Sequence, residues 1–419
     1  MRLTMKERQS LVRVTALRYQ RSRKRDKKVI LDEFVKATGY HRNHASYLLS
    51  RHGRRVRADA KTVYEGEVRK RVRKKRGRTY GPEVVLVLKQ IWEVEDHICG
   101  KRLVAAMPEM IAKLCQFGEL NASREVCDKL LRLSAATADR LLAGERKKAE
   151  LKARAQTKPG TLLKHQIPIR TFSDWDDARP GFVEIDLVSH CGGDGSGDFC
   201  QTLSLTDVAS GWSEPFAVKN KAQVWVFEGI KKVRKHLPFA LLGIDSDNGG
   251  EFINDQLRRY CELEEITFTR SRPYRKNDNC FVEQKNYTIV RRFVGYMRHD
   301  TDKELDILNR LYSRLRLYNN YFLPSMKLVK KTRIGSKVTK RYDHPQTPFE
   351  RLMNSKDVPK KAKDRLAAEY AMLNPAHLKR EITRLQKLLA RTNTLKRKRA
   401  LSGSSSRKPE LNISTASVF

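Results

Sequence analysis

The sequence predicts an α/β core with a mixed β-sheet and helices on both faces, preceded by an all-α region and followed by a basic region of helices and short strands. Two observations predict this architecture. Residues 181–300 alternate short apolar stretches with segments of helical periodicity. They also carry 16 basic and 17 acidic side chains, whereas residues 1–180 carry 43 and 21 and residues 301–419 carry 28 and 10. A charge-balanced centre between two basic flanks indicates a folded core with flanking binding regions.

The charge balance of the whole chain points to a polyanionic partner. The 419 residues carry a formal net charge of +39, and such a surplus repels itself unless a polyanion compensates it. A solvated face is the ordinary explanation of any single Lys/Arg run. A surplus confined to both flanks favours nucleic acid instead.

Cysteine use and hydropathy indicate in which cellular compartment the protein is expected. The seven cysteines lie at irregular intervals without a Cys-x-x-Cys pair, which argues for reduced thiols and against a zinc finger. The N-terminus lacks an apolar signal core, and no stretch approaches eighteen apolar residues. We therefore expect a cytoplasmic, nucleoid-associated protein without a membrane partner.

Residues 1–55 predict an N-terminal helix-turn-helix module. Apolar positions indicate a helix over 29–39 that closes on Gly39, and a second helix over 40–50. A helix, a glycine-bearing turn and a helix are the layout in which the second helix enters the major groove; the alternative is an ordinary helical hairpin. The candidate DNA contacts are Tyr40, His41, Arg42 and Asn43.

Residues 56–81 read as a basic linker. Its run from Arg73 to Arg78 holds a glycine between arginines, which suits a narrow minor groove, but it lacks a following proline, so a flexible linker that contacts phosphates is the other interpretation. Its candidate DNA contacts are Lys75, Arg76 and Arg78.

Residues 82–144 predict a second helical module. Pro82 suits the first turn of a helix, and the stretch 124–142 reads as another helix-turn-helix with Ser134 as the N-cap. The alternative is a helical bundle that supports the first module. Residues 145–180 read as a linker.

The core, residues 181–300, predicts three strands followed by helix, strand, helix, strand and a long helix. The expected strands are 182–188, 200–206, 212–218, 240–244 and 266–269, and the expected helices are 222–236, 253–263 and 281 onward.

Three carboxylates stand where these elements end or begin. Asp186 ends the first strand, Asp247 follows the fourth, and Glu283 lies near the start of the last helix, with thirty-five residues between the latter two. Phosphoryl transfer uses two divalent cations to activate the nucleophile and stabilise the leaving oxygen, and Mg²⁺ prefers oxygen ligands. The trio therefore predicts a catalytic site for two Mg²⁺ ions, with Mn²⁺ as the alternative.

Other acids compete for these roles. Asp245 lies on the same side of its strand as Asp247, so geometry leaves both open, and Glu184 shares a face with Asp186 but lies deeper in the strand. Asp207 is expected to shape a turn, and Glu251 to cap the following helix.

Basic and polar side chains beside the trio predict a grip on DNA. Tyr274 lies among four basic residues and could stack on an unpaired base; a solvated loop is the alternative. His190 could touch a phosphate, without a catalytic role. The candidate contacts are Arg272, Tyr274, Arg275, Lys276, Lys285, Asn286 and Arg291.

Asp186, the Asp247-Asn248-Gly249 segment, and Glu283 with Asn286 resemble the DDE transposase and retroviral integrase superfamily over residues 181–300. The helical N-terminus, the basic C-terminus and the missing zinc-binding domain look more like a bacterial insertion-sequence transposase. The resemblance implies a ribonuclease H-like core and favours Asp247 over Asp245. It also implies metal-dependent cleavage of element ends, joining of the 3′-hydroxyl to target DNA, and homo-oligomers on double-stranded DNA.

Beyond the core, residues 301–400 predict a basic region of helices and strands, and residues 401–419 a disordered tail. Residues 327–342 show β-like alternation and seven Lys or Arg side chains, which indicates a small strand module or a strap across DNA. A stripe of Leu378, Ile382, Leu385 and Leu389 indicates a packing or dimer surface, and the basic run 396–399 is expected to be disordered without DNA. The rival functions are a catalytically silent DNA-binding regulator and a ribonuclease H-like nuclease that cuts without joining.

Overall fold

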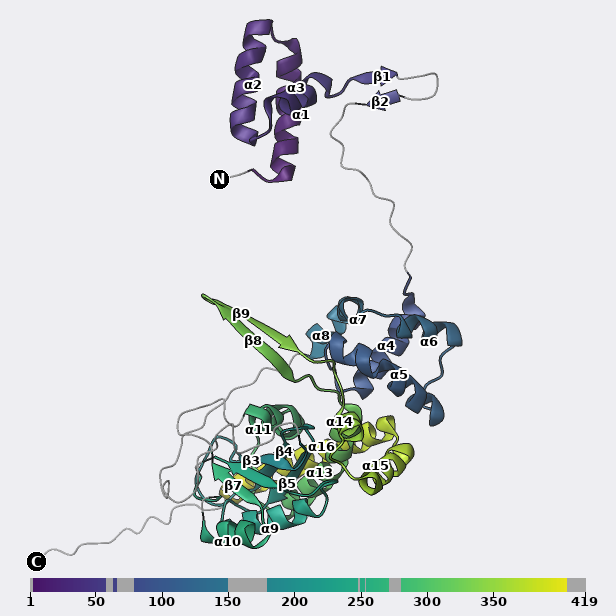
Figure 1. The fold of residues 1–419 in the computed structure, drawn as a ribbon. Helices are drawn as coiled ribbons and strands as arrows, with labels where there is room; N and C mark the ends of the chain where they lie inside the picture. Colours follow the sequence, from purple (N-terminus) through teal and green to yellow (C-terminus); the bar gives the residue numbers. More distant parts are fainter. Residues whose placement is uncertain are drawn as a thin grey trace, which may run out of the picture. The chain divides into compact units, whose positions relative to one another are not determined.

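The computed structural model describes residues 3–57, 63–65, 79–149, 179–247, 249–252, 254–270 and 280–404. The chain divides into two compact units, Met1–Thr79 and Tyr80–Phe419, which Figure 1 colours along the sequence. Among the described helices, none is both long enough and apolar enough to cross a membrane.

The first unit is a three-helix cluster of α1 (Met5–Arg21), α2 (Lys24–Thr38) and α3 (Arg42–Arg51). The three helices share a core of eight buried side chains, Val12, Ala16, Tyr19, Ile30, Leu31, Phe34, Ala45 and Leu49. The sequence prediction missed α1, whose capping box joins the Glu7 carboxylate to the Thr4 N–H at 2.7 Å. The Thr-x-x-Glu spacing is the signal that could have found it.

The predicted helix-glycine-helix layout is present in this unit. Gly39 ends α2 in the left-handed conformation, with φ of 68°, and its N–H donates to Val35 O at 2.8 Å. Glycine adopts this conformation without a steric penalty. The region predicted as a linker begins with two short antiparallel strands, β1 (Arg55–Arg57) and β2 (Val63–Glu65).

The second unit opens with a block of five helices. They are α4 (Pro82–Val94), α5 (Gly100–Gln116), α6 (Arg124–Leu131), α7 (Ala135–Leu141) and α8 (Ala143–Ala149). Ser134 caps α7 as predicted, accepting from Thr137 N–H at 3.3 Å. Residues 145–149, predicted as the start of a linker, are helical because α8 continues through them. The α4–α8 block packs on the rest of the unit; for example, Lys113 Nζ donates to Tyr370 O at 2.7 Å.

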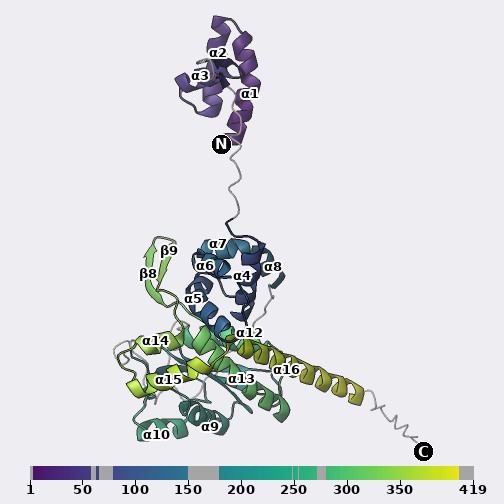
Figure 2. The same ribbon diagram turned by 90° about the vertical axis from the view of Figure 1, so that its right-hand side faces the viewer.

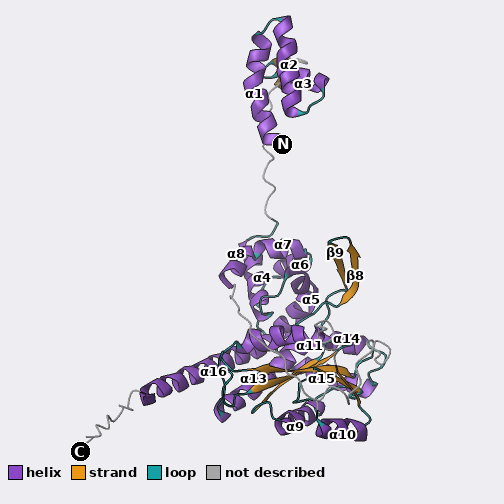
Figure 3. Cartoon of the chain, turned by 90° about the vertical axis from the view of Figure 1, so that its left-hand side faces the viewer, coloured by secondary structure: helices purple, strands orange, loops and turns teal. Residues whose placement is uncertain are grey.

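A five-stranded mixed sheet lies at the centre of this unit, in the order β5-β4-β3-β6-β7. The strands are β3 (Phe182–Ser189), β4 (Gln201–Asp207), β5 (Ser213–Val218), β6 (Gly243–Ser246) and β7 (Thr267–Arg270). The first three pair antiparallel, whereas β6 pairs parallel with both β3 and β7. Figure 3 shows the sheet between helical layers. This arrangement is consistent with the expected ribonuclease H-like core.

Helices cover both faces of the sheet. Gly229 in α9 (Gln223–Arg234) lies against Leu203, and α10 (Asp255–Leu263) flanks β7. Thr202, the neighbour of Leu203 in β4, hydrogen-bonds to Tyr312 of α13 (Asp302–Phe322) at 2.5 Å. Because neighbouring strand residues point to opposite faces, α9 and α13 lie on opposite sides of the sheet.

The predicted long helix after residue 281 has an irregular middle. It runs as α11 (Cys280–Lys285), the π-helical segment η1 (Asn286–Arg291) and α12 (Arg292–Val294), and it ends at Gly295, whose φ is 81°. π-helical segments occur mostly as single turns inside α-helices.

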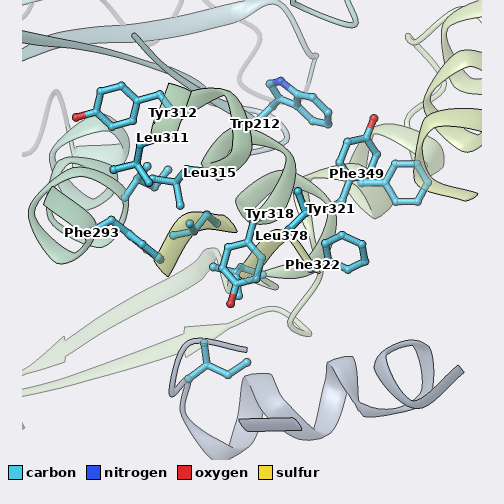
Figure 4. Packing of buried hydrophobic residues seen from close by; sticks show 14 of the residues in the cluster. Trp212, Phe293, Leu311, Tyr312, Leu315, Tyr318, Tyr321, Phe322, Phe349 and Leu378 are labelled. Carbon is cyan, nitrogen blue, oxygen red and sulfur yellow. The ribbon is translucent and has the colours of Figure 1, made fainter. Parts of the chain in front are cut away.

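After α13 the chain forms the hairpin of β8 (Leu328–Ile334) and β9 (Lys337–Tyr342), then α14 (Pro348–Asn354), α15 (Lys360–Met372) and α16 (Pro375–Ser404). Figure 4 shows how the aromatic side chains of α13 pack, with Tyr321 against Phe349 of α14. The apolar stripe from Leu378 to Leu389 is buried, and α16 packs on α13. The stripe is therefore a packing surface within the chain.

The prediction of disorder near the C-terminus is wrong for residues 396–404, which are helical. Lys396 Nζ donates to both carboxylate oxygens of the fully buried Glu304, at 3.0 and 2.8 Å. Asn393 donates to the same carboxylate at 3.1 Å. These bonds fix the end of α16 to α13, and the basic run begins in a folded helix.

Candidate metal centre

Asp247 directly follows β6, whereas Asp186 does not end its strand as predicted but lies inside β3, which continues to Ser189. The ladder between β3 and β6 pairs Glu184 with Asp245 and Ile185 with Ser246. Asp186 and Asp247 occupy the next position along each strand. Because side chains at matching positions of adjacent strands point to the same face, both carboxyl groups emerge at one corner of the sheet, on the side of α11.

The helix that begins with α11 brings Glu283 to this corner, together with Asn286, the first residue of η1. Asn286 Nδ2 donates to Asp186 Oδ2 at 2.5 Å. The buried Glu184 accepts from the Phe281 and Val282 N–H groups at 2.9 and 3.0 Å. A carboxylate on the first N–H groups of a helix satisfies them and opposes the helix dipole. Glu184 thus anchors the helix that carries Glu283.

The electrostatics are those of three neighbouring acids. Burial raises the pKa of Asp186 to about 7, and the negative charges of Asp247 and Glu283 add to the increase. The N–H of Leu187 and the amide of Asn286 act in the opposite direction. Burial also raises the pKa of Asp247, against a 2.9 Å hydrogen bond from Gly249 N–H.

These residues offer an oxygen-donor set suited to a divalent cation. The Asn286 Oδ1 atom is buried and accepts no hydrogen bond in the described part of the chain. Crowded carboxylates and an orphaned amide oxygen are donors that hard cations such as Mg²⁺ accept. Within the described ranges, however, no three His, Cys, Asp or Glu side chains are gathered tightly enough to form a metal site. The donor atoms are of the type that binds a divalent cation, although the three carboxylates are not close enough together to form a complete coordination site.

The competing acids have structural partners. Thr269 Oγ1 donates to the fully buried Asp245 at 2.6 Å, which ties β6 to β7. Asp207 shapes a turn as predicted, accepting from Ser210 N–H at 2.7 Å. Glu251 does not cap α10; Asn254 does so by accepting from Leu257 N–H at 2.8 Å.

Lys285, two residues after Glu283 in the sequence, lies half-buried among cations from distant segments. Burial, followed by the charges of Arg102, Arg351 and Lys327, lowers its pKa to about 7. Arg102 belongs to α5 and Lys327 precedes β8, so this grouping has no signal in the local sequence. A set of like positive charges favours an anionic ligand.

The other predicted contacts near the core divide into two groups. Arg291 lies over the Tyr296 ring at 4.8 Å and is partly buried, so much of its side chain is committed to packing. His190 is fully buried and bonded to Thr202 Oγ1 at 2.7 Å, which removes it from any phosphate. The predicted contacts Arg272, Tyr274, Arg275 and Lys276 lie outside the described residues, as do Lys75, Arg76 and Arg78 of the first unit.

In the first unit, the predicted contacts gather at the start of α3. His41 is its N-cap, accepting from Asn43 N–H at 3.4 Å, and Arg42 forms an ion pair with Asp32. His41, Arg42 and Asn43 are exposed, whereas Tyr40 packs partly buried against His44. Tyr47, which was not among the predicted contacts, is 58% exposed one turn after Asn43.

Comparison with known proteins gives one extensive sequence match. No family model matches the chain. The uncharacterized protein y4rM of Sinorhizobium fredii (strain NBRC 101917 / NGR234) is 42% identical over 350 residues, which cover 84% of this chain and 96% of that protein. The chain belongs to the same family as y4rM.

Solved structures similar to this chain include retroviral integrase cores. The HTLV-2 integrase catalytic core in complex with magnesium, in a dimeric form, has a TM-score of 0.28 and 15% identity, covering 36% of this chain and 93% of that one. The BIV integrase catalytic core has a TM-score of 0.28 and 18% identity, covering 41% and 91%. A likeness this low settles neither the fold nor the activity of the chain.

Proposed function

We propose that the chain is a DNA transposase of the bacterial insertion-sequence type, a metal-dependent polynucleotidyl transferase that cuts the ends of a DNA element and joins them to target DNA. One observation carries this proposal. Asp186 and Asp247 stand at the same corner of adjacent parallel strands, and the charge of Glu283 reaches Asp186 from a third element. Phosphoryl transfer with two cations requires carboxylates of this kind at one point.

In this proposal Asp186 and Asp247 would hold one Mg²⁺ ion, and Asp186 and Glu283 would hold the other. When bound, the ions would supply positive charge that offsets the negative charge around the phosphorus during in-line displacement. Glu283 is exposed on the first turn of α11, and its negative charge acts on Asp186, so it would supply the third carboxylate of the site.

The surrounding residues position the acids. Asn286 holds one oxygen of Asp186, and Glu184 fixes the start of α11 at its backbone. Asp245 takes no part in metal binding, because its carboxylate lies deeper in the sheet and bonds to Thr269. Lys285 holds the scissile DNA strand by a phosphate.

The basic flanks bind the DNA. The start of α3 reads the element end in the major groove, and the α4–α8 block contributes further contacts or supports the fold. The protein acts in the cytoplasm on nucleoid DNA, as a homo-oligomer that holds two ends.

The decisive experiment is a strand-transfer assay with the full chain, Mg²⁺ and a duplex carrying the DNA end that flanks the gene. Asp247→Asn and Glu283→Gln should each abolish the joined product while DNA binding persists, because the flanks carry the positive charge. Asp306→Asn is the matched control, since Asp306 is exposed and forms a surface ion pair with Arg310 at 3.4 Å.

The rival functions give different results in the same assay. Cleavage without joined product would identify a nuclease, and binding without either product would identify a regulator. If activity survives Asp247→Asn but is lost in Asp245→Asn, the metal ligand is Asp245 and the proposed role of Asp247 is wrong. Loss of DNA binding in both acid variants would contradict the division between core and flanks.

A further inference from the structure

The β8–β9 hairpin is a free-standing ribbon. Its two strands pair only with each other, and every side chain described between Leu328 and Tyr342 is exposed. Figures 2 and 3 show it projecting from the second unit beside the α4–α8 block. A two-stranded hairpin is marginally stable by itself in water. Because its described side chains are exposed, no helix or further strand of the described chain packs on this ribbon to stabilise it.

The base of the ribbon is firmly fixed. Lys327 N–H donates to Asp343 Oδ1 at 2.6 Å, and Arg351 forms an ion pair with the other oxygen of Asp343 at 2.7 Å. Below them, Ser325 and Gln346 pair as an isolated bridge. These contacts fix the base of the hairpin to the rest of the second unit.

The charges along the ribbon are all of one sign. Residues 328–342 contain six Lys or Arg and no acid. The register places Lys330 directly opposite Arg341, and like charges at such a position destabilise a strand pair. Among the described residues, no ion pair neutralises Lys330, Arg333, Lys337, Lys340 or Arg341.

The cations occupy both faces of the ribbon. The cross-strand pairs alternate between faces, so Lys330, Arg341 and Lys337 lie on one face, and Lys340 and Arg333 on the other. The exposed apolar side chains of the ribbon, Leu328, Val329, Ile334, Val338 and Tyr342, are interspersed with these cations along the two strands, so neither face is without positive charge. Exposed lysines also discourage a third strand from adding to the edges. Because cationic side chains repel one another on both faces, the ribbon is suited to a partner that places negative charge on both sides of it.

We propose that the β8–β9 hairpin is a DNA-binding ribbon that enters the major groove of double-stranded DNA. The major groove, about 12 Å wide, admits a two-stranded β-ribbon, and its phosphate walls flank an inserted ribbon on both sides. Lys330 and Arg341 contact phosphates of one wall, and Lys340 those of the other. The exposed Ile334 at the tip, 78% accessible, meets the apolar edges of bases, such as thymine methyl groups. This inference rests on the proposed function only in taking DNA as the partner.

Binding measurements on the full chain test the ribbon. The probe is a fluorescein-labelled duplex of about 30 base pairs, titrated in EDTA at several salt concentrations. The double variant Lys330→Gln/Arg341→Gln should bind about tenfold more weakly and reduce the slope of log K against log salt by about 2. Its fold should persist, because the variant removes a repulsive pair; the thermal transition checks this.

Two further variants sharpen the test. Lys235→Gln/Arg259→Gln removes the same charge from exposed positions, one just after α9 and one on α10, and it should leave the slope near that of the unmodified chain. Thr339→Lys adds a cation to the exposed surface of β9 and should tighten binding and steepen the slope. Methylation of guanine N7, which lies in the major groove, should interfere with binding of the unmodified chain more than with binding of the ribbon variant.

The outcomes separate this inference from the proposed function. An unchanged slope in the ribbon variant, or an equal loss in the control pair, would overturn the ribbon. If the ribbon variant loses binding as expected but the unmodified chain yields no joined product, the ribbon stands and the transposase does not. If joining depends on Asp247 while the ribbon variant binds normally, only the ribbon is wrong.

Discussion

Asp247→Asn should stabilise the metal-free protein near neutral pH, although Asp247 belongs to the proposed catalytic site. The substitution removes one of the negative charges that raise the pKa of Asp186. An asparagine at this position keeps the oxygen that accepts from Gly249 N–H. The local turn should therefore survive while the repulsion disappears.

The size of the effect follows from the pKa of Asp186. An increase from 3.8 to about 7 corresponds to about 4 kcal/mol against the ionised form. Burial is the largest cause and Asp247 the second, so we assign about 1 kcal/mol to Asp247. Because Asp186 is only partly buried, solvent screening makes this an upper range. For the second unit, Tyr80–Phe419, about 1 kcal/mol corresponds to about 1–1.5 °C in Tm, because the unfolding entropy is about 2.1 cal/mol/K per residue.

The pH dependence has a definite sign. The folded pKa of Asp186 lies above its unfolded value, so the native state retains this proton between about pH 4 and 7. The cost of ionising Asp186 is absent below that window and complete above it. The gain in Tm from Asp247→Asn should accordingly be near zero at about pH 4 and largest above about pH 7.

Thermal unfolding in EDTA across this pH range measures the prediction, with Asp306→Asn as the control. Added Mg²⁺ should then raise the Tm of the unmodified protein more than that of Asp247→Asn, because a cation offsets the same repulsion. A Tm for Asp247→Asn that equals or falls below the unmodified value above pH 7 would refute the crowding of the three acids.

Two further predictions concern other parts of the chain. Lys396→Met should lower the free energy of unfolding by about 2–4 kcal/mol, because it leaves the buried Glu304 short of a charged partner; urea denaturation measures it, and Lys398→Met, at an exposed position of α16, should have little effect. Asn43→Ala should weaken binding to the cognate DNA end by about 1–3 kcal/mol in a fluorescence titration, whereas Ser10→Ala, at an exposed position of α1, should not; equal affinities would remove α3 from the DNA interface.

The strands were predictable because their apolar runs are short and bounded. The run 182–188 became β3 with one added residue. The run 240–244 was less informative, since β6 begins only at Gly243 and extends to Ser246. Leu241 is buried in the loop before the strand, and burial without strand pairing produces the same apolar signal.

The supporting contacts of the site could not be predicted in the same way. Asn286 bonds to a residue one hundred positions earlier, and Glu184 binds backbone groups at a similar separation. The cations near Lys285 come from α5 and from the segment after α13. No local pattern specifies these pairings, because they depend on how distant elements pack.

The π-helical segment changes which residues of the helix of Glu283 share a face. Regular α-helical spacing places Val290, seven residues on, on the same face as Glu283 and Asn286. In the structure, Ile289 and Val290 are both buried, whereas Asn286 meets Asp186. The extra residue per turn in η1 rotates the later residues into the core. One helix can therefore present its first turn to the acids and bury its third turn, and Gly295 then ends it before the chain enters α13.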